Sequence, residues 1–418
     1  MASSLPFPSR NLLSTIPALP KSLRQFVATP PPERVRFAPY SPLASAAAPA
    51  RLRTVDGLRA LALALVLFNH GSNTSGFPPW LAPLAHDPHL GLGGHGVKLF
   101  FVISGFLVTS MLLRELERTG AIDGREFLLR RARRILPPYL ALVLILGVLR
   151  LGGLFQFDGG HFLAALTFTG GTGGELGHLW SMAVQEQYYL AWPLILIIGG
   201  RSFAVRCALA AVILTPIARV VHATFSPDTS SLYLTNGASI DTLALGCLLA
   251  LAREGLASRR AFNRIVDSPW TVPFLYVLAG ASLLIGWRPS VLLRTPLVSL
   301  ALVFVLERCL RYPDRGLARL LNRRWIVQMG CASFSIYLWQ QPFLDLFSSS
   351  SSASFPTNIL MGIVAGLVSW RLIERPLVAR GTRPHTPAIA GEGVLPTPAP
   401  TLVLSRGPAD VRLARAAG

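Results

Sequence analysis

Ten apolar runs, separated by short polar segments, dominate the sequence. A helix needs roughly 20 apolar residues to cross a bilayer, and these runs are close to that length. In lipid, a chain with so many runs satisfies its backbone hydrogen bonds by forming helices. The predicted fold class is therefore all-α, a polytopic transmembrane helical bundle of about ten spans. The expected spans are 55–72, 96–113, 135–152, 178–198, 203–222, 237–252, 270–287, 290–309, 326–346 and 356–373.

The charge distribution supports this topology. The chain has 418 residues, of which 14% are charged, whereas a soluble domain carries about a quarter. The formal net charge of +19 would fit a nucleic-acid partner, but no basic stripe with interleaved aromatic residues is present. Instead, all but six of the 39 Lys and Arg residues fall in alternate inter-span segments. The positive-inside rule then places both termini in the cytoplasm and makes the lipid bilayer, not nucleic acid, the expected partner.

Composition also suggests three regions. Residues 1–50 are rich in Pro, Ala and Ser, and residues 381–418 in Pro, Ala and Gly, so both are predicted to be disordered and cytoplasmic. Residues 51–380 form the predicted transmembrane domain. We expect no attached soluble catalytic domain, which assigns any activity to the membrane core. The four cysteines lack CxxC or CxxH spacing, so neither a disulfide framework nor a metal site is expected.

Ionisable residues inside spans are costly and are therefore candidates for function. The first span contains Arg59 and His70, eleven residues apart. Eleven helical steps come to three turns plus about 20°, so both side chains share one face, roughly 16 Å apart along the axis. Arg59 lies toward the cytoplasmic end and His70 toward the outer end. A snorkelling arginine and an interfacial histidine would be the structural explanation of the same pattern.

Other spans add polar residues near the outer end and near the cytoplasmic end of the predicted bundle. The outer group consists of Lys98, Ser104, His178, Glu186, Asp241, Gln340 and Gln341. The inner group consists of Asp56, Arg59, Arg130, Arg131, Arg133, Arg134, Glu374 and Arg375. Two polar centres on opposite sides of the core, joined by the face of Arg59 and His70, suggest a path through the protein.

Several strings carry a family resemblance across about residues 51–380. The first is the Arg-x10-His spacing of Arg59, within VDGLRALA (55–62), and His70. The others are GVKLFFVISGFL (96–107), LRRARRILPPY (129–139), HLWSMAVQEQYYLAWP (178–193), DTLALGCLLA (241–250), SFSIYLWQQP (333–342) and IERP (373–376). In this order, they resemble the membrane acyltransferase family 3, whose members decorate bacterial glycans and some macrolides with acyl groups.

The resemblance implies an acyl-CoA co-substrate in the cytoplasm, with acetyl as the default acyl group, and no metal. It implies a carbohydrate or glycolipid acceptor beyond the bacterial inner membrane, acylated on a hydroxyl. The inner arginines are suited to the CoA phosphates through charge-assisted hydrogen bonds. The residues assigned to donor binding are Asp56, Arg59, Arg133 and Arg134.

The transfer needs a base, because a hydroxyl is a poor nucleophile at neutral pH. A neutral His70 can take its proton, with Glu186 as orienting group or charge partner of the imidazolium. An acyl-His70 intermediate is the other mechanism that the sequence allows. The residues assigned to acceptor binding are Lys98, Ser104, His178, Asp241 and Gln340.

Two positions depart from the family pattern. Lys98 stands where many members carry an acidic residue, and Gln340 stands where many carry histidine after Leu-Trp. Both departures bear on substrate class and mechanism.

A different functional class also fits the intramembrane charges. They could form a proton or ion pathway in a secondary transporter of a glycan or small molecule. That class predicts inverted repeats with broken helices, and no convincing internal repeat is found. The sequence therefore favours an O-acyltransferase.

Overall fold

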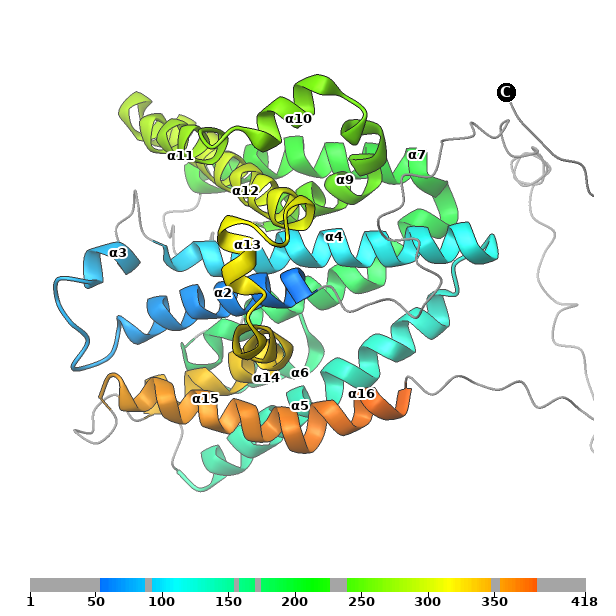
Figure 1. The fold of residues 1–418 in the computed structure, drawn as a ribbon. Helices are drawn as coiled ribbons and strands as arrows, with labels where there is room; N and C mark the ends of the chain where they lie inside the picture. The colour runs from blue at the N-terminus through cyan, green and yellow to red at the C-terminus, as the bar shows by residue number, and fades with distance from the viewer. Residues whose placement is uncertain are drawn as a thin grey trace, which may run out of the picture.

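The computed structural model describes residues 53–86, 92–153, 158–169, 174–225, 239–346 and 354–381. Figure 1 shows these residues as an all-helical bundle, without a strand in the described part of the chain. The predicted N-terminal extension and C-terminal tail lie outside the described residues, apart from Gly381.

The helices follow one another with short connections. In chain order they are α2 (Arg53–Gly71), α3 (Ala82–His86), α4 (Gly93–Thr119), α5 (Gly124–Leu151), α6 (Gly159–Thr167), α7 (Trp180–Phe225), α9 (Ile240–Ala257), α10 (Arg260–Asp267), α11 (Thr271–Ala281), α12 (Trp287–Arg311), α13 (Gly316–Leu321), α14 (Arg324–Leu346), α15 (Thr357–Ser369) and α16 (Arg375–Gly381). A π-helical turn, Trp370–Glu374, joins the last two.

Within the described residues, five helices are long and apolar enough to cross a membrane, and a sixth results if the bent pair Arg260–Asp267 and Thr271–Ile285 is one span. Every expected span overlaps a helix, which confirms the helical prediction. The number of spans, about ten, and the cytoplasmic placement of the termini stay predictions.

The expected span 203–222 falls within α7, and 178–198 does so from Trp180 onward, its first two residues ending the 3₁₀ helix Gly174–Leu179. A straight helix of the 46 residues of α7 would be about 69 Å long, more than twice the hydrocarbon thickness of a bilayer. The helix is broken at Gly200, where φ is 65° and ψ is −171°. Glycine reaches this left-handed conformation without the steric cost of a side chain. The break is therefore consistent with two legs of membrane-spanning length.

Helix α2 lies between α4 and α14 at close backbone distance. Gly96 of α4 faces the carbonyl of Ala62, and Gly330 of α14 faces the backbone of Asp56, in both cases without room for a Cβ atom. Helix α14 runs in the same direction as α2, since its Gln340 meets His70. We refer below to the Arg59 end of the bundle, where α2 begins, and the His70 end, where α2 finishes (Figure 1).

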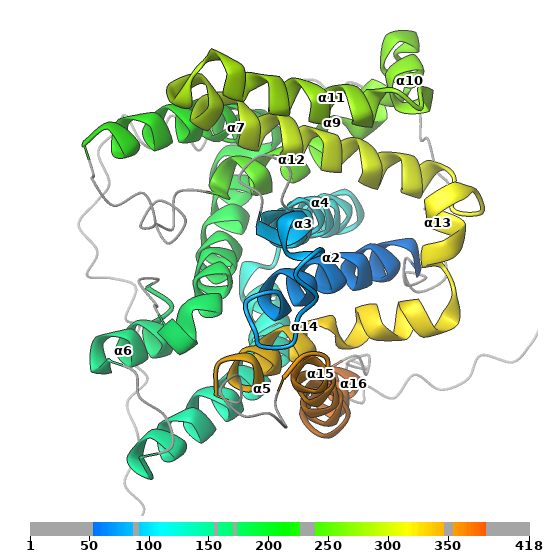
Figure 2. The same cartoon turned by 90° about the vertical axis from the view of Figure 1, so that its left-hand side faces the viewer.

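A second close contact joins α4 to α9. Gly105 faces the carbonyl of Leu243, and Gly246 faces the carbonyl of Val102. Such mutual glycine contacts allow two helices to approach at backbone distance, as is common in membrane bundles. Figure 2 shows α2 and α4 near the centre of the bundle, with α7, α9, α11 and α12 on one side and α5, α14 and α15 on the other.

The outer surface carries many large apolar side chains. Leu144 is 62% exposed, Ile198 81% and Leu284 91%. A soluble protein rarely presents continuous apolar surface of this extent. The distribution matches helices whose outer faces meet lipid.

The α4–α9 contact makes a stability prediction. Gly246→Ala places a methyl group against the Val102 carbonyl and should destabilise the fold by about 1–3 kcal/mol, the usual cost of overpacking. Gly255→Ala, on the exposed side of the same helix with nothing within 4 Å, is the matched control. Thermal unfolding of the purified protein should show a lower Tm for Gly246→Ala alone. Equal Tm values would contradict the close packing.

Candidate active site

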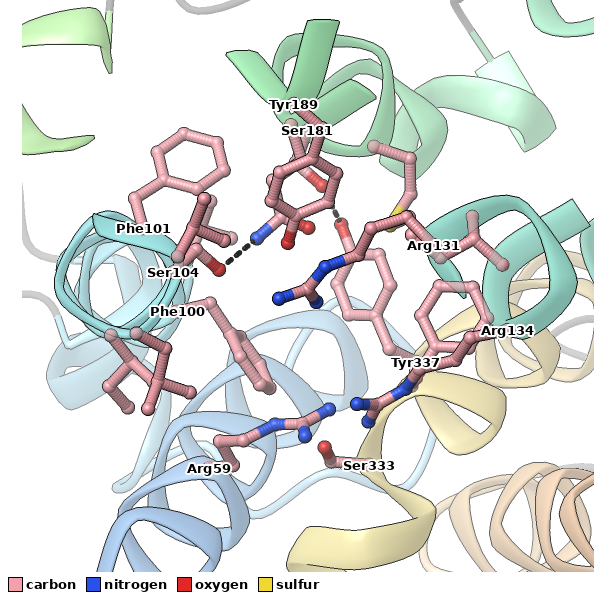
Figure 3. A pocket seen from close by; sticks show the side chains of 18 of the residues that line it. Arg59, Phe100, Phe101, Ser104, Arg131, Arg134, Ser181, Tyr189, Ser333 and Tyr337 are labelled. Atoms are coloured by element: carbon pink, nitrogen blue, oxygen red, sulfur yellow. Dashed lines mark hydrogen bonds between the residues drawn. The ribbon is translucent and has the colours of Figure 1, made fainter. Parts of the chain in front are cut away.

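A cavity of about 150 Å³ lies between α2, α4, α5, α7 and α14 (Figure 3). A single water needs roughly 10–15 Å³ measured in this way, so the space is far larger than a packing defect. Its lining combines guanidinium groups and hydroxyls with apolar and aromatic side chains, a composition typical of ligand sites. The lining residues are Arg59, Val97, Phe100, Phe101, Ile103, Ser104, Leu107, Val108, Met111, Arg131, Arg134, Ile135, Ser181, Met182, Gln185, Tyr189, Ser333, Phe334 and Tyr337.

Three arginines share this cavity. Figure 3 shows the guanidinium groups of Arg59 and Arg134 pointing toward each other, with Arg131 above them. Arg134 and Arg131 lie one helical turn apart on α5 and so share a face. No aspartate or glutamate is among the described residues that line the cavity. The cavity therefore presents a concentration of cationic hydrogen-bond donors.

Carboxylates outside the cavity lining act on two of these guanidinium groups. Glu374 forms an ion pair with Arg134, with 3.5 Å between Oε1 and Nε, and it accepts a hydrogen bond from the Ser335 hydroxyl at 2.8 Å; its side chain is only 3% exposed. The charges of Asp56 and Glu374 also act on Arg59. The ion pair with Glu374 orients Arg134 and leaves its remaining N–H groups available to a ligand.

Arg131 is held differently, by aromatic rings. Its guanidinium carbon lies 4.9 Å from the centre of the Tyr189 ring and 5.5 Å from that of Phe127, both within cation–π range. Glu186 is the carboxylate whose charge acts on Arg131. Because Oε1 of Glu186 is buried without a hydrogen-bond partner in the described structure, this carboxylate is available for a further contact.

Hydroxyl groups form the wall of the cavity nearest the His70 end. The Tyr337 hydroxyl donates to the carbonyl of His178 at 2.7 Å and lies 2.7 Å from the Ser181 hydroxyl. Toward the Arg59 end, Ser104 of α4 accepts a hydrogen bond from the Gln185 amide at 2.6 Å. These bonds join α4, α7 and α14 around the cavity.

His70 lies just beyond this wall. Its Nδ1 is 2.7 Å from Nε2 and 3.1 Å from Oε1 of Gln340, which is fully buried. Gln340 follows Tyr337 by one helical turn on α14, so the imidazole is about one turn past the end of the cavity. The two amide orientations of Gln340 assign opposite tautomers to His70, since an amide N–H donates to Nδ1 whereas the amide oxygen accepts from it.

The structure brings together only some residues predicted from sequence. Arg59, Arg134 and Ser104 line the cavity, and His70 meets Gln340. Sequence analysis assigned donor binding to Arg133, which is exposed, and did not assign Arg131, which lines the cavity. Helical spacing was the available signal, because Arg131 and Arg134 are three residues apart.

The remaining predicted residues lie elsewhere. Asp56 and His178 are buried behind the cavity wall, and the His178 Nε2 lies 3.2 Å from the Leu338 carbonyl. Asp241 forms a buried ion pair with Arg219 of α7, and the Lys98 ammonium lies 3.5 Å from the Gly94 carbonyl; neither residue lines the cavity. Among the described residues, His70 contacts Gln340, and the charge of Glu186 acts on Arg131, so the orienting role of Glu186 toward His70 stays a prediction. No group of three potential metal ligands occurs in the described parts of the chain.

The fold and site thus define a helical membrane protein with a cationic cavity leading toward a histidine. The chain belongs to the family described as "Acyltransferase domain", whose model it matches over residues 52–374. This confirms the resemblance seen in the sequence.

The chain is similar to named O-acetyltransferases. It is 27% identical to "O-acetyltransferase OatA" of Staphylococcus aureus (strain NCTC 8325 / PS 47), covering 80% of this chain and 58% of that protein. It is also 27% identical to "Putative peptidoglycan O-acetyltransferase YrhL" of Bacillus subtilis (strain 168), covering 69% of this chain and 51% of that protein. The chain therefore spans little more than half the length of these relatives. No solved structure matches it.

The hydroxyl wall generates a stability prediction. Tyr337→Phe removes the shorter of two hydrogen bonds to the His178 carbonyl, which keeps the one from Ser181, and should lower the free energy of unfolding by about 1 kcal/mol. Tyr276→Phe is the control, because no described group is hydrogen-bonded to its hydroxyl. Denaturation of the two purified variants measures the difference. A Tyr337→Phe variant as stable as Tyr276→Phe would contradict the hydrogen-bonded wall.

Proposed function

We propose that this protein moves an acetyl group from cytoplasmic acetyl-CoA to a hydroxyl of a carbohydrate on the far side of a bacterial cytoplasmic membrane. Membership of the acyltransferase family and similarity to O-acetyltransferases support the reaction class. The observation that carries the rest is the cavity itself, in which three guanidinium groups lie at one end and His70 lies one turn past the other.

The donor fits the Arg59 end. Arg59, Arg131 and Arg134 supply forked N–H donors of the kind that bind phosphate oxygens in pairs. The apolar side chains of α4 that line the cavity between the arginines and its His70 end then form a path for the pantetheine arm. Its length is comparable to the separation of Arg59 and His70 along α2, roughly 16 Å. With the phosphates at the arginines, the thioester would reach the neighbourhood of the imidazole.

His70 is suited to two forms of the chemistry. As a general base, its free imine nitrogen takes the proton of the acceptor hydroxyl while the oxygen attacks the thioester carbonyl. The tetrahedral intermediate then expels the CoA thiolate, which takes the proton from the imidazolium. In the alternative, an imidazole nitrogen attacks first, releases CoA as the thiol, and passes the acetyl group to the hydroxyl.

Gln340 supports the base mechanism through the tautomer of His70. When the amide oxygen of Gln340 accepts from Nδ1–H, the lone pair of His70 lies on Nε2, the nitrogen left for the acceptor hydroxyl. The glutamine can orient the ring but cannot take up a proton. We therefore assign Gln340 as a positioning residue where many family members carry histidine.

The orientation follows from the Lys and Arg distribution. Those residues concentrate in the segments at the Arg59 end, which the positive-inside rule places in the cytoplasm, where acyl-CoA is found. The His70 end then faces away from the cytoplasm. A carbohydrate acceptor agrees with the peptidoglycan named for the Bacillus subtilis relative.

The function is tested by His70→Ala. We expect loss of acetyl transfer from radiolabelled acetyl-CoA to cell-wall glycan in membranes containing the variant, because neither mechanism survives without the imidazole. His161→Ala is the control, because it makes the same substitution at a histidine of α6 that does not line the cavity. Full transfer by an equally expressed His70→Ala protein would refute both forms of the mechanism.

The donor site is tested by comparing neighbouring arginines. Arg134→Gln should raise KM for acetyl-CoA roughly tenfold, the loss of about one charge-assisted hydrogen bond. Arg133→Gln removes the same charge from the exposed side of α5 and should leave KM unchanged. Initial rates at varied acetyl-CoA measure both constants. An equal rise in the two variants would assign the effect to net charge and not to the cavity.

A further inference from the structure

Ser333 of α14 carries a buried hydroxyl for which the fold provides no hydrogen-bond partner. The residue lines the cavity and is 0% exposed, and its Oγ bonds to no group that the structure describes. Buried hydroxyls are usually hydrogen-bonded, because an unpaired one has given up its bonds to water without replacement. A helical serine or threonine can use a carbonyl of its own helix, as Thr224 does with the Val220 carbonyl at 2.7 Å. Ser333 makes no such bond among the described residues, so its hydroxyl is left for a group in the cavity.

The packing of α2 against α14 places Ser333 level with Arg59. The two helices run in the same direction, and Gly330 meets the backbone of Asp56 without room for a Cβ atom. Arg59 lies three residues after Asp56, close to one helical turn. Ser333 lies the same distance after Gly330. One turn beyond the backbone contact, the serine and the arginine are therefore neighbours on the two helices.

A second contact holds Arg134 against the same stretch of α14. Glu374 accepts a hydrogen bond from the Ser335 hydroxyl at 2.8 Å and pairs with Nε of Arg134 at 3.5 Å. Figure 3 shows the guanidinium groups of Arg59 and Arg134 pointing toward each other, with the Ser333 hydroxyl pointing toward the same space. Because no hydrogen bond joins this hydroxyl to a described residue, the three groups converge without satisfying one another.

The chemistry of the three groups selects the ligand. Each guanidinium has five N–H donors, and the serine adds an O–H donor. Two guanidinium groups that face each other repel, and an anion between them removes that repulsion. The oxygens of a phosphate group accept from forked arginine donors and from a hydroxyl at the same time. A phosphate-bearing ligand therefore fits this end of the cavity.

We propose that Ser333 completes a binding site for the diphosphate of CoA, in which its hydroxyl, Arg59 and Arg134 all donate to phosphate oxygens. The inference rests on the proposed function and adds to it the phosphate group that is bound and an uncharged residue that binds it. The pantetheine arm extends from the diphosphate, and Ser333 is level with Arg59, roughly 16 Å from His70 along α2. A diphosphate at Ser333 places the thioester within reach of the imidazole. The 3′-phosphate of CoA lies on the ribose, beyond the diphosphate as seen from the thioester.

Calorimetric titration of CoA into the full-length protein in lipid nanodiscs measures the contribution of the hydroxyl. Ser333→Ala should raise the Kd for CoA roughly tenfold, the loss of one hydrogen bond to a charged group. Ser369→Ala is the matched control. Ser369 is 4% exposed on α15, its hydroxyl likewise has no partner among the described residues, and it does not line the cavity. This variant should bind CoA as the wild type does.

Thermal unfolding without CoA separates a binding role from a structural one. Neither substitution removes a hydrogen bond within the described structure, so both variants should melt at or above the wild-type Tm. A Ser333→Ala protein that melts clearly below Ser369→Ala would give the serine a structural bond and overturn the inference.

Titration of 3′-dephospho-CoA identifies the phosphate group. This compound keeps the diphosphate and lacks the 3′-phosphate, so Ser333→Ala should weaken its binding by the same factor as that of CoA. A loss confined to CoA would place the serine at the 3′-phosphate and overturn the assignment. An unchanged Kd for both compounds would overturn it as well.

Acetyl transfer from acetyl-CoA to glycan in the same nanodiscs separates this inference from the proposed function. Transfer by the wild type, together with a Kd for CoA that does not depend on Ser333, overturns the inference and leaves the proposed function standing. CoA binding that depends on Ser333, without transfer to any glycan, supports the diphosphate site and contradicts the acetyltransferase proposal.

Discussion

Helix α2 is fixed between α4 and α14 because glycines of both neighbours face its backbone. Gly96 and Gly330 leave no room for a side chain at these contacts, so the position of α2 along both neighbours is set. The same packing determines where Arg59 and His70 lie, one at the cavity and one just beyond it. A shift of α2 by one turn, about 5.4 Å, would separate His70 from Gln340.

Charge is distributed in two groups with different degrees of compensation. Around the cavity, Glu374 pairs with Arg134 from outside the lining, and the charges of Asp56 and Glu374 act on Arg59, while no described acidic side chain lines the cavity. Outside the cavity lining, Asp241 on α9 forms a buried ion pair with Arg219 on α7. In a bundle with an apolar surface, the cationic cavity favours an anionic ligand, which in our account is the CoA donor.

Sequence analysis predicted the helical elements well because apolar length is a strong signal, and the shared face of Arg59 and His70 follows from helical geometry alone. It could not identify the partner of His70, since the contact with Gln340 depends on how α2 and α14 pack across 270 residues of sequence. For the same reason the sequence alone does not separate Arg131, which lines the cavity, from Arg133, which is exposed, because the positions of α4 and α7 decide which side of α5 faces the cavity. The span count stays a prediction because several helices are short or bent, as the Gly200 break in α7 illustrates.

The central claim is that donor and acceptor reach the site from opposite ends of the bundle. Proteoliposomes with one known orientation of the protein test it directly, with glycan acceptor enclosed and radiolabelled acetyl-CoA added outside. Our account predicts label on the enclosed glycan when the Arg59 end faces outward, and none when the His70 end does. Transfer that occurs only with donor and acceptor on the same side of the membrane would contradict it.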